Sequence, residues 1–379
     1  MKRSLLIVGV ILLFIVPGGF AKDKLPSKKE IIQSMTRVCD WQLTNLKTEY
    51  LRKDGKTDRV PNTDWVRGAF LTGLMAQYYT TQKQMYLDSA IAICSRNNWE
   101  CGRRSRHADD LTVGQTYLEI YRIKRNEAMM LPVKQRLDAI IAQPMRGPVV
   151  GWEGNKNWSW CDALFMAPPV FARMFDVTKN MAYLDTMNIL WTDTYNLLYD
   201  KTEKLFYRDT RFCPKPDGTQ QLSVNGKKIF WGRGNGWVVS GLVRVLQYMP
   251  VNYPARGKYE QVFKEMCEKI ATLQGNDGLW RASLLDYAEY PSPETSGSGF
   301  FCYAMAWGIN NGLLPAKKYL PVVLKAWKGL NWAIDAKTGM LGWVQAVGAD
   351  PRSVSADETQ EYGAGAFLLA GSELAKMAK

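Results

Sequence analysis

The chain has 379 residues, seven cysteines, a single histidine and a formal net charge of +13. With one histidine and no Cys-x-x-Cys pair, the sequence argues against a structural zinc site, and we expect neither a metal nor a cofactor. The basic charge favours acidic partners, such as uronate-bearing glycans, over nucleic acid. Because the lysines and arginines are scattered, a role in solubility explains most of them equally well.

The N-terminus resembles a targeting signal. Lys2 and Arg3 precede an apolar run over residues 4–16, and small residues then stand at the −3 and −1 positions of a cleavage site. A membrane anchor is the alternative, but the run is shorter than the ~20 residues that a span needs. We expect residues 1–21 to be a signal peptide and the mature chain, which starts near Lys22, to be periplasmic or secreted without stable membrane insertion.

Amphipathic helical patterns with a charged face recur six times along the mature chain. They are expected near residues 27–46, 82–96, 126–142, 179–198, 256–274 and 315–333. Most of the cysteines lie in apolar helical runs, so we expect buried free thiols, although Cys94 and Cys101 could form a disulfide.

A second kind of helix alternates with the first. It carries few charges, is rich in Gly, Ala, Met and aromatic residues, and begins with a polar or aromatic cluster. These clusters are 62–68 (NTDWVRG), 108–114 (ADDLTVG), 160–163 (WCDA), 232–237 (GRGNGW), 294–297 (ETSG) and 358–363 (ETQEYG).

Helices with little charge on any face are buried on most sides. Six of them alternating with six amphipathic helices predict an all-α fold, an (α/α)6 barrel whose inner helices all begin at one rim. Length alone would favour two domains, but this repeat predicts one catalytic domain over residues 22–379. A helical solenoid is the alternative; its repeats are usually shorter and more alike. Residues 205–231 break the pattern and predict short strands around a β-hairpin turn at Asn225-Gly226.

The clusters at the rim suggest a sugar-binding cup. Six tryptophans fall at or near it, although each could equally belong to the core: Trp65, Trp152, Trp158, Trp160, Trp231 and Trp237. Asp162 begins an apolar helix, where burial would raise the pKa of its carboxyl group and suit it to proton donation. A helix N-cap explains Asp162 equally well.

The other candidates each have an ordinary alternative. Asp109 and Asp110 are consecutive acids at a helix start, a common arrangement. His107 is more readily explained as a structural residue than as a catalytic one. Arg233, beside Gly234-Asn235-Gly236, could present its guanidinium to a substrate carboxylate; this turn lacks the Lys-Ser/Thr of a phosphate-binding loop.

Four segments together resemble the unsaturated glycuronyl hydrolases, specifically glycoside hydrolase family 105, which is related to family 88. They are 160–169 (WCDALFMAPP), 230–237 (FWGRGNGW), 277–280 (DGLW) and 294–297 (ETSG). The resemblance implies an (α/α)6 barrel that removes a 4,5-unsaturated uronic acid from the non-reducing end of lyase-generated pectin or rhamnogalacturonan-type oligosaccharides.

The implied reaction is hydration of a vinyl ether. Asp162 protonates C4 and activates the water that adds to C5, after which the hemiketal opens and releases the sugar. A second aspartate, Asp109 or Asp110, would position the substrate, and Asp109 is preferred. The resemblance further implies a set of residues that bind an acidic oligosaccharide: Trp65, His107, Trp160, Arg208, Trp231, Arg233, Asn235, Trp237, Glu294 and Ser296.

One position departs from the better-known members of that family, which carry a histidine in the loop after the catalytic helix. This chain has Arg208 there, followed by Asp209. Two other functions stay open at this point: an ordinary glycosidase acting on a saturated uronide, with Asp110 and Asp162 as opposed carboxylates, and a non-catalytic glycan-binding protein.

Overall fold

The computed structural model describes residues 24–51, 56–143 and 158–378. One set of helices is amphipathic and lies on the outside of the fold. This outer set comprises α1 (Lys28–Thr44), α3 (Gln84–Ser95), the 3-10 turn η1 (Glu127–Met129) with α6 (Leu131–Ala142), α9 (Ala182–Leu198), α11 (Arg256–Thr272) and α13 (Ala316–Trp332). All six predicted amphipathic segments are confirmed within a few residues.

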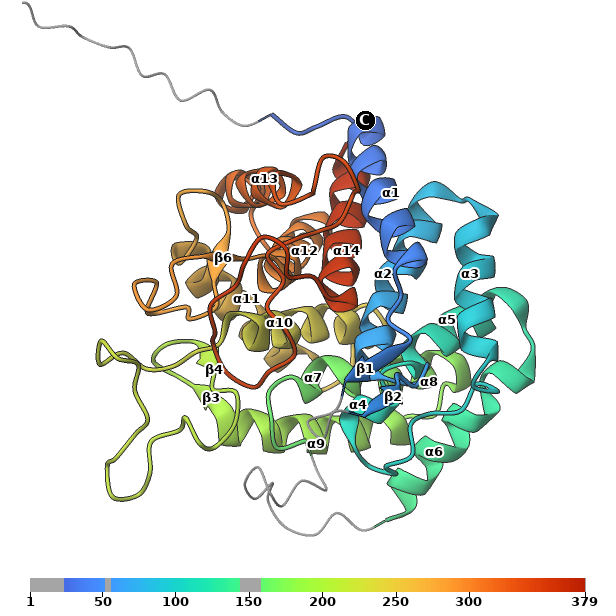
Figure 1. Cartoon of the computed structure of the whole chain (residues 1–379). Helices are drawn as coiled ribbons and strands as arrows, with labels where there is room; N and C mark the ends of the chain where they lie inside the picture. Colours follow the sequence, from blue (N-terminus) through green and yellow to red (C-terminus); the bar gives the residue numbers. More distant parts are fainter. Residues whose placement is uncertain (1–23, 52–55, 144–157, 379) are drawn as a thin grey trace, which may run out of the picture.

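The inner set follows the six polar clusters. It comprises α2 (Trp65–Thr81), α4 (Ala108–Leu111) with α5 (Gly114–Lys124), α7 (Ala163–Met166) with α8 (Pro168–Thr178), α10 (Gly232–Leu246), α12 (Thr295–Asn310) and α14 (Glu361–Met377). The two sets alternate along the chain, and in Figure 1 α3, α6, α9 and α13 lie around the outside while α2, α10, α12 and α14 lie within. The predicted (α/α)6 arrangement is confirmed.

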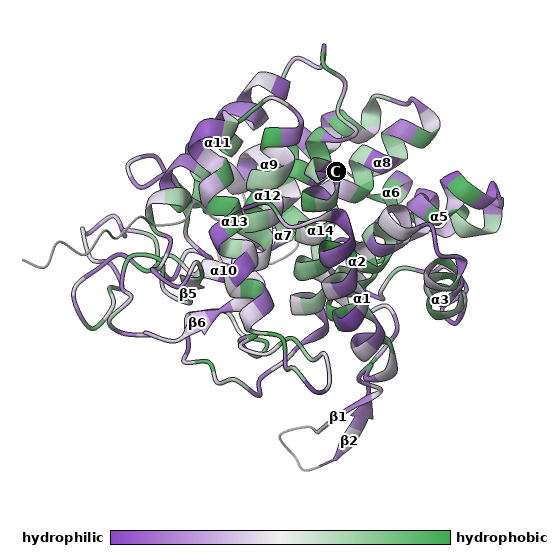
Figure 2. Ribbon diagram, turned by 90° about the horizontal axis from the view of Figure 1, so that it is seen from above, coloured by the Kyte–Doolittle hydropathy of each residue, from purple (hydrophilic) through white to green (hydrophobic). Residues whose placement is uncertain are grey.

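Burial separates the two sets for the physical reason that the sequence suggested. Every residue of α10 is buried, whereas α1 buries one stripe that includes Ile31, Met35 and Val38, spaced for a single helix face. In Figure 2 the hydrophilic residues of α11 lie on the outside of the molecule. The inner helices therefore carry the core, and the outer helices cover it.

Close packing between inner helices depends on small residues. The backbones of α2 and α14 approach so closely that a Cβ atom on Gly73 would lie 2.6 Å from the carbonyl oxygen of Gly365. A Cβ on Gly365 would in turn lie 2.6 Å from the carbonyl oxygen of Ala69. Larger side chains would force the two helices apart.

Two of the inner helices begin with a separate single turn. Pro168 and Pro169 occupy the first positions of α8, where proline is tolerated because these positions need no intrahelical N–H bond. The preceding turn, α7, is thereby set off from α8. In the same way α4 precedes α5. Asp162 and Asp109 both stand on these short turns, and α4 packs against α7 (Figure 1).

The strands are short and pair locally. β1 (Glu49–Leu51) pairs with β2 (Thr57–Arg59), β3 (Tyr199–Asp200) with β4 (Leu205–Phe206), and β5 (Trp280–Arg281) with β6 (Pro293–Glu294), all antiparallel. The hairpin turn at Asn225-Gly226 is present, with Gly226 at φ +71° and a bridge between Leu222 and Lys228.

The expectation that short strands over residues 205–231 pair around this turn was wrong in part. Leu205 and Phe206 pair with Asp200 and Tyr199, the residues just before them, rather than with the later hairpin. The side chain of Asn235 forms hydrogen bonds with the backbone N–H and carbonyl groups of Phe206, as described below. The rest of the segment, apart from the hairpin turn, is loop.

Two further expectations concern cysteines and membranes. All seven cysteines are free thiols, so Cys94 and Cys101 form no disulfide, and burial raises the pKa of Cys101 to about 12. Across the described residues, no helix combines the length and the apolar character needed to cross a bilayer.

Candidate active site

Asp162 stands at the rim, directly before α7. Its backbone is already helical, and its side chain makes no capping hydrogen bond to the first turn. Instead the Oδ2 atom accepts a hydrogen bond from the Cys161 thiol at 3.6 Å and lies 3.3 Å from Nε of Arg208. The side chain is 10% exposed. Of the two explanations left open by the sequence, capping is therefore not what this carboxyl group does.

Arg208 is held beside Asp162 by its own neighbours. The carbonyl oxygen of Arg208 accepts a hydrogen bond from the N–H of Cys161 at 2.8 Å. Its Nη1 atom donates to Oδ2 of Asp209 at 2.8 Å. Because both ends of the residue are held, its guanidinium lies where the family resemblance would place a histidine.

Asp209 is fully buried and anchors two arginines. Besides Arg208, it accepts three hydrogen bonds from the backbone N–H, Nε and Nη2 of Arg211. Burial alone would raise the pKa of Asp209, but the bonds from Arg211 and Arg208 outweigh it and hold the pKa below the ordinary value. Asp209 is thus an ionised support for Arg208, a role that the sequence did not reveal.

Asp109 on α4 is the second carboxyl group of the cup. Burial and the negative charge of Asp162 raise the pKa of Asp109 to about 7, against the opposing charges of Arg104 and Arg208. The side chain keeps 20% of its surface exposed, so the group is reachable from the cup. Asp109 therefore holds its proton close to neutral pH.

His107 and Trp160 form one wall beside Asp109. Their rings lie 4.8 Å apart, and Nδ1 of His107 lies 3.7 Å from Oδ2 of Asp109, beyond hydrogen-bonding distance. Burial, helped by the Arg104 guanidinium, lowers the pKa of His107 to about 4. The imidazole is therefore neutral at physiological pH, and its Nδ1 has no hydrogen-bond partner within the described parts of the chain.

Asp110 has a different environment. Its carboxylate accepts hydrogen bonds from the backbone N–H of Arg104 at 2.6 Å and from the Arg104 guanidinium at 2.6 and 3.1 Å. These contacts close the loop before α4, where a Cβ on Gly102 would collide with the same carboxylate. The geometry therefore favours Asp109 over Asp110 as the partner of Asp162.

Arg233 does not reach the cup. Its side chain has no exposed surface, and Nη1 and Nη2 donate to the carbonyl oxygens of Gln345 and Ala346 at 2.5 and 2.9 Å. The guanidinium also lies over the rings of Trp231 and Tyr362. The expected contact with a substrate carboxylate is replaced by support of the loop before α14, because two carbonyl groups already occupy the terminal Nη1 and Nη2 donors and the Nε atom is buried.

Asn235 is likewise turned toward the backbone. Its Oδ1 atom accepts from the N–H of Phe206 at 2.8 Å, and its Nδ2 donates to the carbonyl oxygen of Phe206 at 3.0 Å. The amide thus pairs with Phe206 as a neighbouring strand would. Since Arg208 follows two residues later, Asn235 acts on the cup through the position of Arg208 and makes no contact with substrate.

Glu294 and Ser296 are occupied at the start of α12. The Glu294 carboxylate accepts hydrogen bonds from Ser296 N and Oγ, from Gly297 N and from Gln345 N. Glu294 is therefore the N-cap that α12 requires. Both side chains are buried, and neither is free to bind a ligand directly.

The tryptophans divide between the core and the rim. Trp237 is fully buried and packs against Phe165 and Phe300 on the barrel axis. Trp65 is partly exposed at the start of α2 and stacks on Tyr362 at 5.4 Å. Trp158 and Trp231 are buried, and Trp152 lies outside the described residues. Trp65 is thus the best-placed aromatic platform among those predicted.

Gln345 is a rim residue that the sequence patterns did not single out. Its side chain accepts a hydrogen bond from Trp231 Nε1 at 3.0 Å and donates to the carbonyl oxygen of Asp350 at 2.8 Å. Its carbonyl oxygen binds Arg233 and the Tyr362 hydroxyl. Because it lies in an irregular loop, no periodicity marked it. Over the described residues, no group of His, Cys, Asp and Glu is arranged to hold a metal ion.

Comparisons with known proteins bear on this cup. The sequence profile of Glycosyl Hydrolase Family 88 matches residues 34–378. An unsaturated 3S-rhamnoglycuronyl hydrolase of Formosa agariphila is 40% identical over 384 residues, covering 97% of this chain and 98% of the relative. A protein of the same name from Alteromonas sp. (strain LOR) is 33% identical, covering 93% of this chain and 88% of the relative.

Solved structures show the same fold. A glycosyl hydrolase family 88 protein from Bacteroides vulgatus superposes with a TM-score of 0.81 at 30% identity, over 93% of this chain and 99% of the other. A possible family 105 member from Salmonella enterica has a TM-score of 0.75 at 18% identity, over 97% of this chain and all of the other.

Proposed function

Since the chain belongs to glycosyl hydrolase family 88, we propose that it removes a 4,5-unsaturated uronic acid from rhamnose at the non-reducing end of an oligosaccharide. The predicted class, a glycoside hydrolase acting on unsaturated uronides, is confirmed by the family and by two relatives at 33% and 40% identity. The residues that perform the reaction and the neighbouring sugar form the new part of the proposal.

The observation that carries the assignment of residues is the pairing of Asp109 and Asp162. One of them, Asp109, holds its proton to a pKa of about 7 because burial and the charge of Asp162 disfavour its ionisation. The other lies within 3.3 Å of a guanidinium nitrogen. The pair can therefore supply a proton at neutral pH and accept one afterwards.

In the proposed reaction, Asp162 receives the proton that Asp109 holds and delivers it to C4 of the unsaturated sugar, while the double-bond electrons form the C4–H bond. Positive charge then develops at C5 and the ring oxygen. Water adds to C5 and loses its proton to the Asp162 carboxylate. The hemiketal that results opens by breaking the bond between C5 and the ring oxygen, as the proton of the C5 hydroxyl moves to that oxygen. This leaves a hemiacetal at C1, which collapses to an aldehyde and releases the neighbouring sugar as an alcohol. Asp162 then returns the proton gained from water to Asp109, which restores the starting state of the pair.

An acidic substrate suits the cationic groups of the rim. Arg208 lies at the cup, and the Arg104 side chain beside Asp110 is 58% exposed. The pairing of Asp110 with Asp162 expected for a conventional glycosidase is weakened, because Asp110 accepts three hydrogen bonds from Arg104 and is a poor second carboxylate. A conventional glycosidase needs two carboxyl groups that can both reach the glycosidic bond.

The names of the two relatives join an unsaturated uronic acid to rhamnose with the prefix 3S, which we take as a sulfate on O3. We propose the same neighbouring sugar here, in preference to the unsulfated rhamnose of pectic rhamnogalacturonan. The test uses two lyase-generated disaccharides that differ only in this sulfate. Faster loss of the ultraviolet absorbance of the double bond with the sulfated disaccharide supports the proposal; equal or slower loss contradicts it.

The assignment of Asp162 has its own test. We expect Asp162→Asn to reduce turnover of the preferred disaccharide by at least about a thousandfold, with unchanged thermal stability and circular dichroism. Activity near the wild-type level would remove Asp162 from the mechanism. Hydrolysis of a saturated aryl uronide by the wild-type enzyme would favour the conventional glycosidase instead.

Export from the cytoplasm is proposed from the sequence alone. The signal peptide expected at residues 1–21 lies outside the described residues. Expression of the full chain, fractionation of the cells and N-terminal sequencing of the exported protein test it: a mature start near Lys22 is expected, and retention of the uncleaved chain in the cytoplasm would contradict it.

A further inference from the structure

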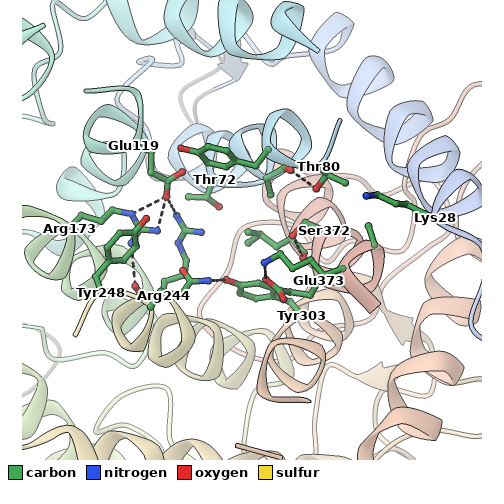
Figure 3. Close-up of a pocket in the computed structure, with 16 residues that line it drawn as sticks. Lys28, Thr72, Thr80, Glu119, Arg173, Arg244, Tyr248, Tyr303, Ser372 and Glu373 are labelled. Carbon is green, nitrogen blue, oxygen red and sulfur yellow. Dashed lines mark hydrogen bonds and ion pairs between the residues drawn. The ribbon is translucent and has the colours of Figure 1, made fainter. Parts of the chain in front are cut away.

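A second cavity lies at the end of the barrel opposite the cup. It has a volume of about 280 Å³ and is lined by the C-terminal halves of inner helices (Figure 3). Trp65 and Thr80 mark the two ends of α2, and at 1.5 Å per residue they are separated by roughly 22 Å. Because the inner helices all begin at the cup, none of the groups assigned to the reaction belongs to this second cavity.

Two arginines share one carboxylate on its wall. Arg173 donates to Oε1 of Glu119 through Nε at 2.9 Å and through Nη2 at 2.7 Å. Arg244 donates to the same oxygen through Nη2 at 2.9 Å. Figure 3 shows both guanidinium groups converging on Glu119. All three side chains are more than nine-tenths buried, so the cluster carries an excess positive charge that little water can solvate.

The hydrogen bonds of Arg173 account for its presence. Its Nη1 atom donates to the carbonyl oxygens of Pro169 and Arg244 at 3.1 and 3.3 Å. Arg244 lies in the last turn of α10, where carbonyl groups attract cations, whereas Pro169 lies in the first turn of α8. Arg173 therefore has a complete structural role in closing this end of the barrel.

Unlike Arg173, Arg244 keeps a donor nitrogen that no protein group accepts from. Nε donates to Gln115 and Nη2 to Glu119, but Nη1 has no protein partner anywhere in the described chain, although the side chain is only 3% exposed and lines the cavity. Burial and the repulsion from Arg173 lower the pKa of Arg244. An anion placed against Nη1 would accept hydrogen bonds from the unused donors. It would also offset the free-energy costs of burying the Arg244 charge and of its repulsion from Arg173.

The rest of the wall suits a small polar molecule. Tyr248, Tyr303, Lys28 and Lys376 are among the lining residues. The ring of Tyr248 packs against the Arg173 guanidinium, and the Tyr303 hydroxyl accepts a hydrogen bond from Gln247. Glu373, the other acid of the cavity, is already bound by Lys376 and by Asn310. The cavity volume lies near the lower end of the range for ligand pockets, which corresponds to a molecule of about monosaccharide size.

We propose that this cavity is a second, non-catalytic binding site for a small oxyanion, a carboxylate or sulfate group carried on a sugar-sized molecule and held by the free edge of Arg244. Its chemistry matches acidic monosaccharides, whether their charge is a uronate or a sulfate ester. The site is independent of the reaction proposed above.

The test compares the full-length protein with variants at the two ends of the barrel. Sodium sulfate, glucuronate and glucose are titrated at constant ionic strength, and the melting temperature and the heat of binding are measured. Sulfate and glucuronate should stabilise the wild type, and glucose should not. Ala76→Phe, which fills the cavity without removing a charge, should weaken binding at least tenfold, as should Arg244→Gln.

Arg208→Met serves as the control at the cup, where an anion could also bind. The stabilisation should persist in this variant. Loss of binding in Arg208→Met, persistence in Ala76→Phe, or equal effects of glucose and glucuronate would each overturn the proposal. Ala76→Phe keeps the test decisive if Arg244→Gln fails to fold, since it leaves the Glu119 cluster intact.

Discussion

Nε of Arg208 lies 3.3 Å from Oδ2 of Asp162, and the Cys161 thiol donates to that same oxygen. One oxygen of the proposed catalytic carboxyl group is therefore engaged by the protein. Arg208 lies in the loop after β4, 46 residues along the chain from Asp162. The arrangement depends on how that loop is held.

Loss of Arg208 should impair catalysis more than stability. Arg208→Met removes the charge that orients Asp162, and we expect kcat to fall about 10- to 100-fold with a smaller change in KM. Arg208→Lys should recover part of the loss, because it restores the charge without the planar guanidinium. Steady-state kinetics on the unsaturated disaccharide measure both.

The control for Arg208 is Arg256→Met. Arg256 is also partly buried and ion-paired, but with Glu260 at the opposite end of the barrel. Arg256→Met should lower stability, because Nη1 of Arg256 also donates to the carbonyl oxygens of Leu246 and Met249, and should leave kcat unchanged. A fall in kcat of similar size in both variants would mean that Arg208 acts only through folding.

The raised pKa of Asp109 makes stability depend on pH. The folded state holds this proton up to a pKa of about 7, whereas the unfolded chain loses it near the ordinary value of 3.8. The folded state therefore binds more protons between these values, and stability falls as the pH rises from about 4 to 7. Above pH 7 the full free-energy cost of ionising the buried Asp109 is present in the folded state.

Asp109→Asn should remove that cost. We expect the variant to be more stable than the wild type at pH 8, by on the order of 2 kcal/mol, and equal to it at pH 4. Urea unfolding at the two pH values measures the difference. An equal effect at both would show that the Asp109 carboxyl group is not the titrating one.

The ionisation of Asp109 should also affect the pH dependence of the activity. If catalysis needs Asp109 protonated, kcat/KM of the wild type declines above a pH of about 7. His107, whose pKa lies near 4, should contribute nothing to this limb. A pH–rate profile of His107→Gln that kept the same alkaline limb would agree; a shift of that limb would implicate the imidazole.

Asn235 should matter for both folding and activity. Asn235→Ala leaves the N–H and carbonyl groups of Phe206 without their partners in a buried site, a loss of about 2–3 kcal/mol. The remaining folded enzyme should also have a lower kcat, because the loop that carries Arg208 loosens. Asn311→Ala, at an exposed amide, should cost less than about 0.5 kcal/mol.

The close contact of α2 and α14 gives a stability test away from the cup. Gly365→Ala places a Cβ atom 2.6 Å from the carbonyl oxygen of Ala69, and we expect a loss of at least about 3 kcal/mol. Gly257→Ala in α11 meets no atom within 4 Å and should be neutral or stabilising by up to ~1 kcal/mol. Chemical denaturation of the two variants compares them, and similar losses in both would refute the packing argument.

The alternation of inner and outer helices could be predicted from the sequence, because the residues of a short segment show how much of a helix is buried. Charges on one face of α1 and their near absence from α10 are properties of short segments, and they persist whatever the rest of the chain does. The position of Asp162 at a helix start followed from the same pattern. So did the presence of several polar clusters at one rim.

Which side chains of those clusters face the cup was decided by the tertiary structure. Arg233, Asn235 and Glu294 looked like ligand-binding groups, yet each is bound by backbone groups of another segment. Those partners lie 29 to 112 residues away along the chain, and no local pattern reveals them. A buried polar group takes whichever partner the fold brings to it, so Asp109, Asp162 and Arg208 could be separated from their neighbours only once the helices were packed.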